Sequence, residues 1–214
     1  MYKRQILNNI NLNQPKHIIT LEDPIEFVFP RGQCLIDQRE FGVDFESWNT
    51  SLRYILRQDP DIVFVGEMRD YETIASTMTI SETGHLVFAT LHTNSAAQTV
   101  DRIIDVFPNT QQAQIRAQLA NVITAVVSQR LVPLARGGRR AVLEIMIATP
   151  AIRTAIREGK THMIDNMIRT GQDYGMNSME NSLIDLIEKG LVSIDTAKAY
   201  SVHPDEIDSL LVRK

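Results

Sequence analysis

Three short segments of the chain place acidic or histidine side chains at the ends of apolar runs. The first segment is residues 22–26, EDPIE, which follows the apolar run at residues 17–21. Its carboxylates, on Glu22, Asp23 and Glu26, could bind a metal or activate water if the run is a buried strand. A solvated acidic loop explains the same spacing equally well.

The second segment is residues 59–70, DPDIVFVGEMRD. Its apolar run ends at Glu67, which is the Walker B pattern, in which a carboxylate at a strand tip holds a Mg²⁺-bound water. Gly66 would let another stretch of backbone approach closely. A buried strand can also end in an acid by chance, and Arg69 could form a surface ion pair of little energetic value.

The third segment is residues 83–93, TGHLVFATLHT, in which His85 and His92 bracket an apolar run. A histidine beside a phosphate can donate a hydrogen bond to it or respond to its charge. A single histidine at a strand end is more often a structural residue. The odd spacing puts the two histidines at opposite ends and on opposite faces of the strand, so we expect different roles for them.

These segments need a sheet that presents their ends side by side. Continuous apolar runs at residues 17–21, 62–65 and 86–91 predict strands that are covered on both faces. Apolar residues at helical spacing predict helices between and after these strands. The predicted helices are residues 48–56, 71–83 and 96–106. Alternating strands and helices indicate an α/β fold with a mainly parallel sheet, which binds ligands at the carboxyl ends of its strands.

The rest of the chain reads as mainly helical. We predict a long helix over residues 109–131 and a hairpin of strands 132–134 and 141–147 around a turn at residues 136–139. Beyond Pro150 the pattern is helical to the end of the sequence. The helices predicted there are residues 151–158, 163–170, 179–189 and 194–200.

Composition excludes several classes of protein. The chain has 214 residues, a net charge of −4 and a single cysteine, Cys34. It is long and apolar enough for a globular core, and one cysteine excludes an internal disulfide and a multi-cysteine zinc site. The absence of a basic region gives no electrostatic case for nucleic acid. No apolar run could span a bilayer and no secretory signal is evident, so we expect a soluble cytosolic protein.

Together, the three segments resemble the Asp box, the Walker B motif and the His box of the type II/type IV secretion ATPases. Residues 151–158, AIRTAIRE, resemble the AIRNLIRE element of the type IV pilus retraction ATPases, with Thr154 and Ala155 in place of the central pair. The resemblance covers nearly the whole chain. It implies an α/β fold with a RecA-like P-loop NTPase core at residues 1–148, its first strand and P-loop missing, and a helical C-terminal subdomain at residues 149–214.

The resemblance also implies roles for individual residues, with ATP and Mg²⁺ as cofactors. Glu26 matches the glutamate that activates the attacking water, Glu67 the one that orients the Mg²⁺ shell through water, and His92 the residue near the γ-phosphate. Phosphoryl transfer needs mainly such positioning and charge neutralisation. The other residues expected at the nucleotide are Glu22, Asp23, Arg69 and His85, the last as a tie between the catalytic segment and its surroundings.

For the intact protein, the resemblance implies ATP hydrolysis that powers pilus retraction and twitching motility. It implies a cytoplasmic homohexamer, peripheral at the inner membrane through a pilus platform protein, without a transmembrane segment or a nucleic acid partner. A type II secretion or pilus assembly ATPase usually carries a four-cysteine zinc element, which one cysteine excludes. Two alternatives stay open, namely an inactive subunit that assembles with active ones and a metal-dependent hydrolase that works without a P-loop.

The sequence contains no phosphate-binding loop of the form G-x-x-x-x-G-K-[ST]. The only Gly-Lys pair is Gly159-Lys160, but position 154 holds Thr154 where such a loop needs glycine, and the preceding residues read as a helix. Residues 1–11 would suit the end of the helix that follows the P-loop in the family. We therefore expect a fragment of a longer ATPase that is inactive alone.

The segment at residues 151–158 has two faces. Ile152 and Ile156 are spaced to meet the core on one face of a helix, and Arg153 and Arg157 form a basic stripe beside it. Periodicity alone favours two solvated arginines. The resemblance adds the alternative that the stripe contacts a neighbouring subunit or the pilus machinery.

Overall fold

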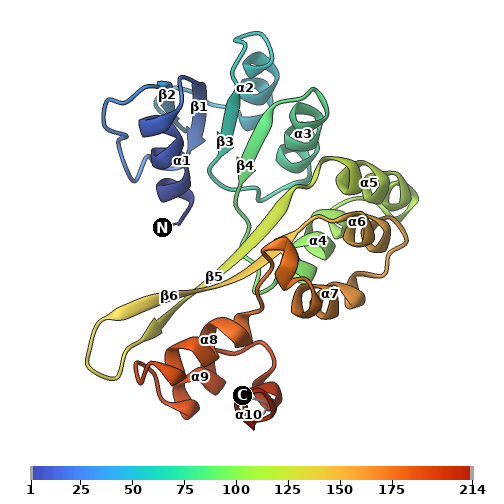
Figure 1. Cartoon of the computed structure of the whole chain (residues 1–214). Coiled ribbons are helices and arrows are strands. Elements are labelled where there is room, and N and C mark those ends of the chain that lie inside the picture. Colours follow the sequence, from blue (N-terminus) through green and yellow to red (C-terminus); the bar gives the residue numbers. More distant parts are fainter. Residues whose placement is uncertain (1, 213–214) are drawn as a thin grey trace. The chain divides into compact units, whose positions relative to one another are not determined.

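A computed structural model describes residues 2–212, with side chains from Arg4 onward. The chain divides into two compact units, Met1–His92 and Thr93–Lys214 (Figure 1). All the predicted site residues at the ends of the three sequence segments belong to the first unit. A domain boundary near residue 148 stays a prediction.

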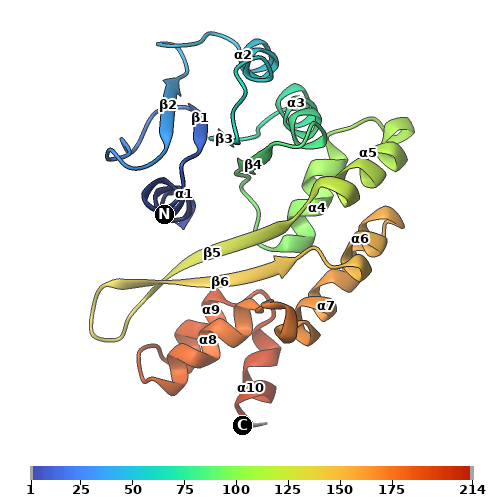
Figure 2. The same cartoon turned by 45° about the horizontal axis from the view of Figure 1, so that its top comes forward.

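The described part of the first unit contains a four-stranded parallel sheet with the strand order β2–β1–β3–β4. Its elements are α1 (Tyr2–Asn13), β1 (His17–Glu22), β2 (Leu35–Glu40), α2 (Trp48–Ile55), β3 (Ile62–Val65), α3 (Tyr71–Glu82) and β4 (Leu86–Ala89). Figure 2 shows α1 on one side of the strands and α2 with α3 on the other. The predicted α/β fold is confirmed. Because the strands are parallel, their carboxyl ends lie at one edge of the sheet.

The central strands are covered on both faces. Ile18, Ile62 and Phe64 pack with Leu7 of α1. Ile19 has the opposite orientation in the pleat and is also fully buried. This two-sided burial explains why the predicted strands read as continuous apolar runs.

Strand β2 is absent from the sequence prediction. It pairs with β1 alone among the described residues and so forms an edge of the sheet. Its sequence, LIDQRE, is mostly polar and only partly buried. A half-exposed edge strand does not need the continuous apolar run on which the prediction relied.

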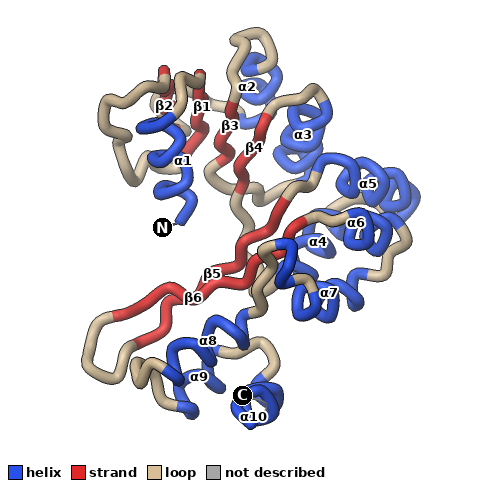
Figure 3. The backbone as a smooth tube through the Cα atoms, viewed as in Figure 1, coloured by secondary structure: helices blue, strands red, loops and turns tan. Residues whose placement is uncertain are grey.

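The second unit consists of an antiparallel hairpin and helices, drawn as red strands and blue coils in Figure 3. Its elements are α4 (Ala96–Asp105), α5 (Asn109–Val122), β5 (Ala125–Pro133), β6 (Arg139–Ile147), α6 (Pro150–Arg157), the short 3₁₀ helices η1 (Thr161–Met163) and η2 (Gln172–Tyr174), α7 (Ile164–Thr170), α8 (Met179–Glu188), α9 (Ile194–Tyr200) and α10 (Pro204–Val212). The hairpin turn contains Gly137 and Gly138, both with positive φ, as the predicted turn requires. No helix in the described residues is both long and apolar enough to cross a bilayer.

The predicted helix over residues 109–131 is wrong in its last third. The helix ends at Val122, and Ile123 has extended backbone angles. From Ala125 the chain forms β5, which pairs with β6 up to the pair Ala125↔Ile147. Pairing with a distant strand overrides the local helical pattern here, and the β-branched pair Val126 and Val127 fits the strand well.

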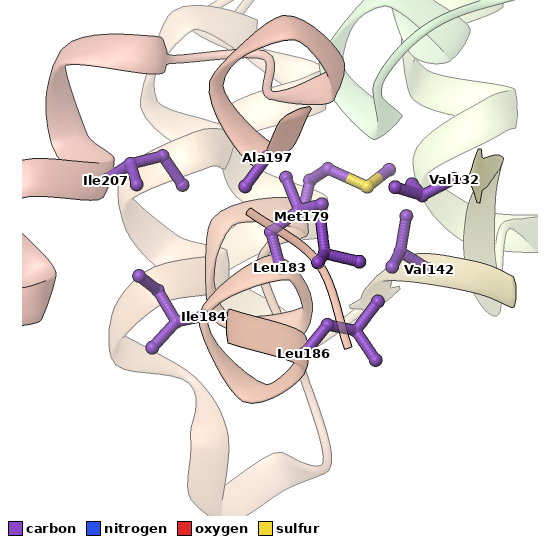
Figure 4. Packing of buried hydrophobic residues seen from close by; sticks show 9 residues of the cluster. Val132, Val142, Met179, Leu183, Ile184, Leu186, Ala197 and Ile207 are labelled. Atoms are coloured by element: carbon purple, nitrogen blue, oxygen red, sulfur yellow. The ribbon is translucent and has the colours of Figure 1, made fainter. Parts of the chain in front are cut away.

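The hairpin packs against the C-terminal helices. Figure 4 shows Val132 and Val142 of the hairpin facing Met179 and Leu183 of α8. The same cluster includes Ile207 of α10, which is fully buried. The helices predicted after Pro150 are therefore present, and α8, α9 and α10 share one core with the hairpin.

Candidate functional site

The site lies where β1 and β3 end in the first unit. The Gly66 N–H donates to the Leu21 carbonyl oxygen over 2.7 Å. A Cβ atom at position 66 would lie 2.9 Å from that oxygen and 3.2 Å from the Cα of Glu22. The close approach expected at Gly66 is therefore present, and it brings Glu67 beside the start of the EDPIE loop.

The segments after β3 and β4 stay together beyond the strands themselves. The Met68 N–H donates to the Thr90 carbonyl oxygen over 3.0 Å, and the Thr90 hydroxyl donates to the Gly66 carbonyl oxygen. These bonds fix the chain just before His92. Thr90 is not among the predicted site residues, and its only signal in the sequence is its place near the end of the apolar run at residues 86–91, two residues before His92.

Glu67 is held between two basic side chains. Arg69 Nη2 lies 2.7 Å from Glu67 Oε2, and His92 Nε2 lies 3.1 Å from Glu67 Oε1. The hydrogen bond from Arg69 is the main reason why the pKa of Glu67 lies below its usual value, and the charges of Arg69 and His92 add to the effect. The Glu67 side chain is 22% exposed and that of His92 is 86% exposed. Glu67 is thus a mostly covered carboxylate, ionised at neutral pH, with exposed basic groups on both oxygens.

Arg69 also reaches the EDPIE loop. Its Nη1 lies 3.8 Å from Asp23 Oδ2, just before the cis peptide bond between Asp23 and Pro24. The same guanidinium therefore links the end of β3 with the loop that follows β1. Its carboxylate contacts raise the pKa of Arg69, first through the Glu67 hydrogen bond, so it remains charged.

The two glutamates of the EDPIE segment, one at the end of β1 and one in the loop after it, have different partners. Glu22 Oε1 accepts hydrogen bonds from the Thr20 hydroxyl and from Gln38 Nε2, which tie it to the sheet. Glu26 forms an ion pair with Arg4 of α1, and its side chain is more than half exposed. Of the two, Glu26 is the carboxylate that water and a ligand can reach.

His85 is not part of this arrangement. It precedes β4, whose first residue Leu86 pairs with Ile62 at the start of β3. Its Nδ1 lies 2.9 Å from the Thr83 hydroxyl oxygen. The structure therefore brings Glu67, Arg69, Asp23 and His92 together at the carboxyl edge and leaves His85 at the amino edge.

A magnesium ion fits this site as a partner of one carboxylate. No group of three or more His, Cys, Asp or Glu residues in the described chain is arranged to hold a metal. Mg²⁺ in nucleotide sites is bound through one or two carboxylates, with phosphates and water as its remaining ligands. The ionised Glu67 supplies one such carboxylate, which suits contact through water.

The predicted basic stripe on α6 needs correction. Ile152 and Ile156 are fully buried, as predicted. Arg153, however, donates from Nη1 to the Ala120 and Asn121 carbonyl oxygens over 2.6 and 2.7 Å, and from Nε to a third carbonyl. These carbonyls include the last turn of α5, whose acceptors have no helical partner. Arg153 is therefore a capping residue within the second unit and not a solvated side chain.

Comparison with known proteins agrees with this geometry. Residues 4–136 match the family described as Type II/IV secretion system protein. The chain is 47% identical over 200 residues to the type IV pilus retractation ATPase PilT of Pseudomonas aeruginosa, covering 94% of this chain and 58% of that protein. It is 49% identical over 194 residues to a twitching motility protein of Neisseria gonorrhoeae, covering 90% and 52%.

A solved structure of similar fold is the crystal structure of the pilus retraction motor PilT with bound ADP. It superposes with a TM-score of 0.89 at 41% identity and covers 97% of this chain and 59% of that one. The chain thus spans about half the length of the curated relatives it matches. The family match over most of the sequence, together with the parallel sheet and its strand-end site, means that this chain belongs to the Type II/IV secretion system protein family.

Proposed function

We propose that the protein encoded by the whole gene is an ATPase that powers type IV pilus retraction and twitching motility. The observation that carries this proposal is the ionised Glu67 between Arg69 and His92, at the strand edge where α/β proteins bind ligands. Supporting it are relatives described as a retraction ATPase and as a twitching motility protein, and a similar structure with bound ADP.

Each site residue has a proposed task. Glu26, exposed on its loop, takes the proton of the water that attacks the γ-phosphate. Glu67 orients the water shell of Mg²⁺, and His92 donates a hydrogen bond toward the γ-phosphate. Glu22 and Asp23 support the loop near the nucleotide, Arg69 joins that loop to Glu67, and His85 ties the β4 segment to its surroundings.

Mg²⁺, when bound with the nucleotide, would neutralise phosphate charge. The residues of this chain contribute the Glu67 carboxylate and keep it ionised through Arg69 and His92. A nucleotide site also needs a phosphate-binding loop, and the 214-residue sequence contains none. We therefore expect that this chain alone does not hydrolyse ATP measurably.

The proposed assembly is a cytoplasmic homohexamer that acts at the inner membrane with the pilus platform protein. The relatives' names support retraction over assembly. The single cysteine agrees, since four cysteines would be needed for the zinc element usual in assembly and secretion motors.

The test uses the protein encoded by the whole gene. ATP hydrolysis is measured with and without Mg²⁺ in the wild type and in Glu26→Gln. We expect Mg²⁺-dependent turnover in the wild type, and in the variant a loss of turnover with nucleotide affinity retained, because Glu26 acts on water and not on the phosphates. Hydrolysis by Glu26→Gln at the wild-type rate would remove the proposed base.

Two other outcomes would select the open alternatives. A protein that binds no nucleotide but associates specifically with an active motor subunit would be an inactive subunit. Metal-dependent turnover of a substrate other than ATP by the 214-residue chain would make it a hydrolase of another kind.

A further inference from the structure

The loop that carries Glu26 has no helix or strand of its own. Residues 23–34 lie between β1 and β2 without regular structure. The backbone N–H and C=O groups of such a loop need partners from elsewhere. Near Glu26, two side chains of β2 supply them, whereas Asn11 of α1 binds the later residues Pro30 and Gln33.

The first of these side chains is that of Gln38, which binds the backbone just after Glu26. Its Nε2 donates to the Phe27 carbonyl oxygen over 2.9 Å, and its Oε1 accepts from the Phe29 N–H over 3.0 Å. The same Nε2 also donates to Glu22 Oε1 over 3.0 Å. One amide group thereby joins the end of β1 to the far side of the loop.

The second side chain is that of Glu40, which binds the backbone just before Glu26. Its Oε2 accepts from the Ile25 N–H over 2.9 Å. Gln38 and Glu40 alternate along β2, so their side chains project from the same face of the strand. In the register of the sheet Gln38 lies beside Thr20 and Glu40 beside Glu22, at the end of β1 from which the loop departs.

We propose that Gln38 and Glu40 are positioning residues that hold the backbone on both sides of Glu26 and thereby set where its carboxylate lies. This inference rests on the proposed function, because it concerns the base of that reaction. The two side chains bind the residues before and after Glu26 and leave its own carboxylate exposed. They therefore affect turnover through geometry, since a catalytic group displaced by about 1 Å can lose about a hundredfold in rate.

The test compares matched variants of the protein encoded by the whole gene. In Glu40→Ala and Gln38→Ala, we expect kcat to fall by about tenfold or more while the KM for ATP stays within about twofold. Glu40→Gln keeps an oxygen acceptor for the Ile25 N–H and should restore most of the rate. Arg39→Ala is the control on the same strand, because Arg39 binds Gln58 and not the loop.

Hydrogen exchange gives a second measurement that does not depend on activity. The peptide that covers residues 23–30 should exchange faster in Glu40→Ala and Gln38→Ala than in the wild type or in Arg39→Ala. Protection equal to that of the wild type would show that the two side chains do not hold the loop, and would overturn the inference.

The kinetic outcomes separate this inference from the proposed function. If Glu26→Gln is inactive while Glu40→Ala and Gln38→Ala turn over at the wild-type rate, the function stands and the positioning role is wrong. If Glu26→Gln keeps the wild-type rate, the assignment of Glu26 as the base fails and this inference fails with it, whereas the ATPase proposal stands. A wild-type protein without Mg²⁺-dependent ATP hydrolysis would contradict the proposed function itself. A variant that no longer binds nucleotide would show that its residue does more than position Glu26, which also overturns the inference.

Discussion

The imidazole of His92 and the carboxylate of Glu67 approach within 3.1 Å, between Nε2 and Oε1, and so connect the ends of two neighbouring parallel strands. Glu67 is mostly covered and His92 is mostly exposed. The exposed imidazole is therefore available to a ligand that arrives from solvent. Arg69 occupies the other oxygen of Glu67 and is the main cause of its lowered pKa, so the ionised state of the carboxylate does not depend on His92 alone.

The two histidines should respond differently to substitution. His92→Ala should lower the ATPase rate of the protein encoded by the whole gene, because it removes the group that we propose donates a hydrogen bond toward the γ-phosphate. Its melting temperature should hardly change, since the lost side chain is exposed. His85→Ala loses a hydrogen bond with Thr83 at the other end of β4, so its rate should fall less. Equal rates in both variants would remove this distinction.

The ion pair between Glu67 and Arg69 should also be detectable in the titration of the Glu67 carboxyl group. Because Arg69 lowers the pKa of Glu67, the folded protein binds a proton there less readily than the unfolded chain. The pair therefore stabilises the fold above the ordinary glutamate pKa of 4.5 and stops doing so as pH falls through the lower, folded value. In Arg69→Ala, the pKa of Glu67 should rise, as measured by NMR of ¹³C-labelled glutamate. An unchanged titration would show that Arg69 is not the cause.

The central strands of the first unit can be predicted from the sequence because both of their faces are buried. Ile18 and Ile19 are adjacent, point to opposite faces and are both fully buried, so the middle of β1 shows no alternation of apolar and polar residues. β2 carries no such signal. Gln38 and Glu40 have partners in a loop that precedes them in the chain, and no local spacing reveals such a contact.

The sequence indicates which residues lie at the strand ends better than it indicates how these residues contact one another. An acid after an apolar run marks Glu67, but the pairing of its two oxygens depends on how closely Gly66 approaches Leu21 and on the bonds made by Thr90. These are contacts between different strands. The wrong prediction of a helix at residues 123–131 has the same cause, namely a contact with a distant strand. Only the pairing with β6 makes this segment a strand.

Gly66 should tolerate no side chain. A Cβ atom there would lie 2.9 Å from the Leu21 carbonyl oxygen, and backbone atoms cannot move away as a flexible side chain would. Gly66→Ala should therefore lower the free energy of unfolding by about 1–3 kcal/mol, as overpacking does elsewhere. The control is Gly190→Asn, because Gly190 has a φ of +63°, in the left-handed region that asparagine tolerates best, and open space around it. Urea unfolding that ranks the control as the less stable variant would contradict the prediction.

Ionisation of Glu144 in the second unit should lower the stability of the fold as pH rises. It is 5% exposed, and Oε1 accepts hydrogen bonds from the Ala96 N–H over 2.7 Å and from the Ser128 hydroxyl over 3.3 Å. Burial raises the pKa of Glu144, and the nearby Asp165 and Glu180 add to this shift. The folded protein therefore holds this proton more readily than the unfolded chain, so stability falls as pH rises from about 4.5 to the folded pKa.

Two substitutions of Glu144 separate its charge from its hydrogen bonds. Glu144→Gln keeps an acceptor for the Ala96 N–H and should remove this part of the pH dependence. Glu144→Ala should lower the free energy of unfolding by about 1–3 kcal/mol, because it leaves buried donors without a partner. Thermal unfolding of both variants between pH 4 and pH 8 would check this, and parallel curves for wild type and Glu144→Gln would contradict it.

Replacing Arg153 and replacing Arg157 should affect the stability of the protein to different extents. Arg153 donates to three backbone carbonyls, whereas Arg157 makes one long side-chain contact, 3.4 Å from Nη2 to Asn121 Oδ1. Arg153→Ala should lower the free energy of unfolding by about 2 kcal/mol, since it removes charge-assisted bonds from the end of α5. Arg157→Ala should change it by less than about 0.5 kcal/mol.

This difference decides how the basic stripe can be tested for a partner. A double variant would confuse lost stability with lost contact, so only Arg157→Ala, at normal protein levels, reports on a contact made by the stripe. We expect it to fold normally, to hydrolyse ATP in the protein encoded by the whole gene, and to impair twitching motility if α6 faces the pilus machinery. Arg153→Lys is the matched control for the capping role, because lysine keeps the charge but cannot bind the three carbonyls with one planar group. It should therefore lose stability although its charge is unchanged. If Arg153→Ala melts at the same temperature as Arg157→Ala, the capping role of Arg153 is wrong, and both arginines are solvated surface residues.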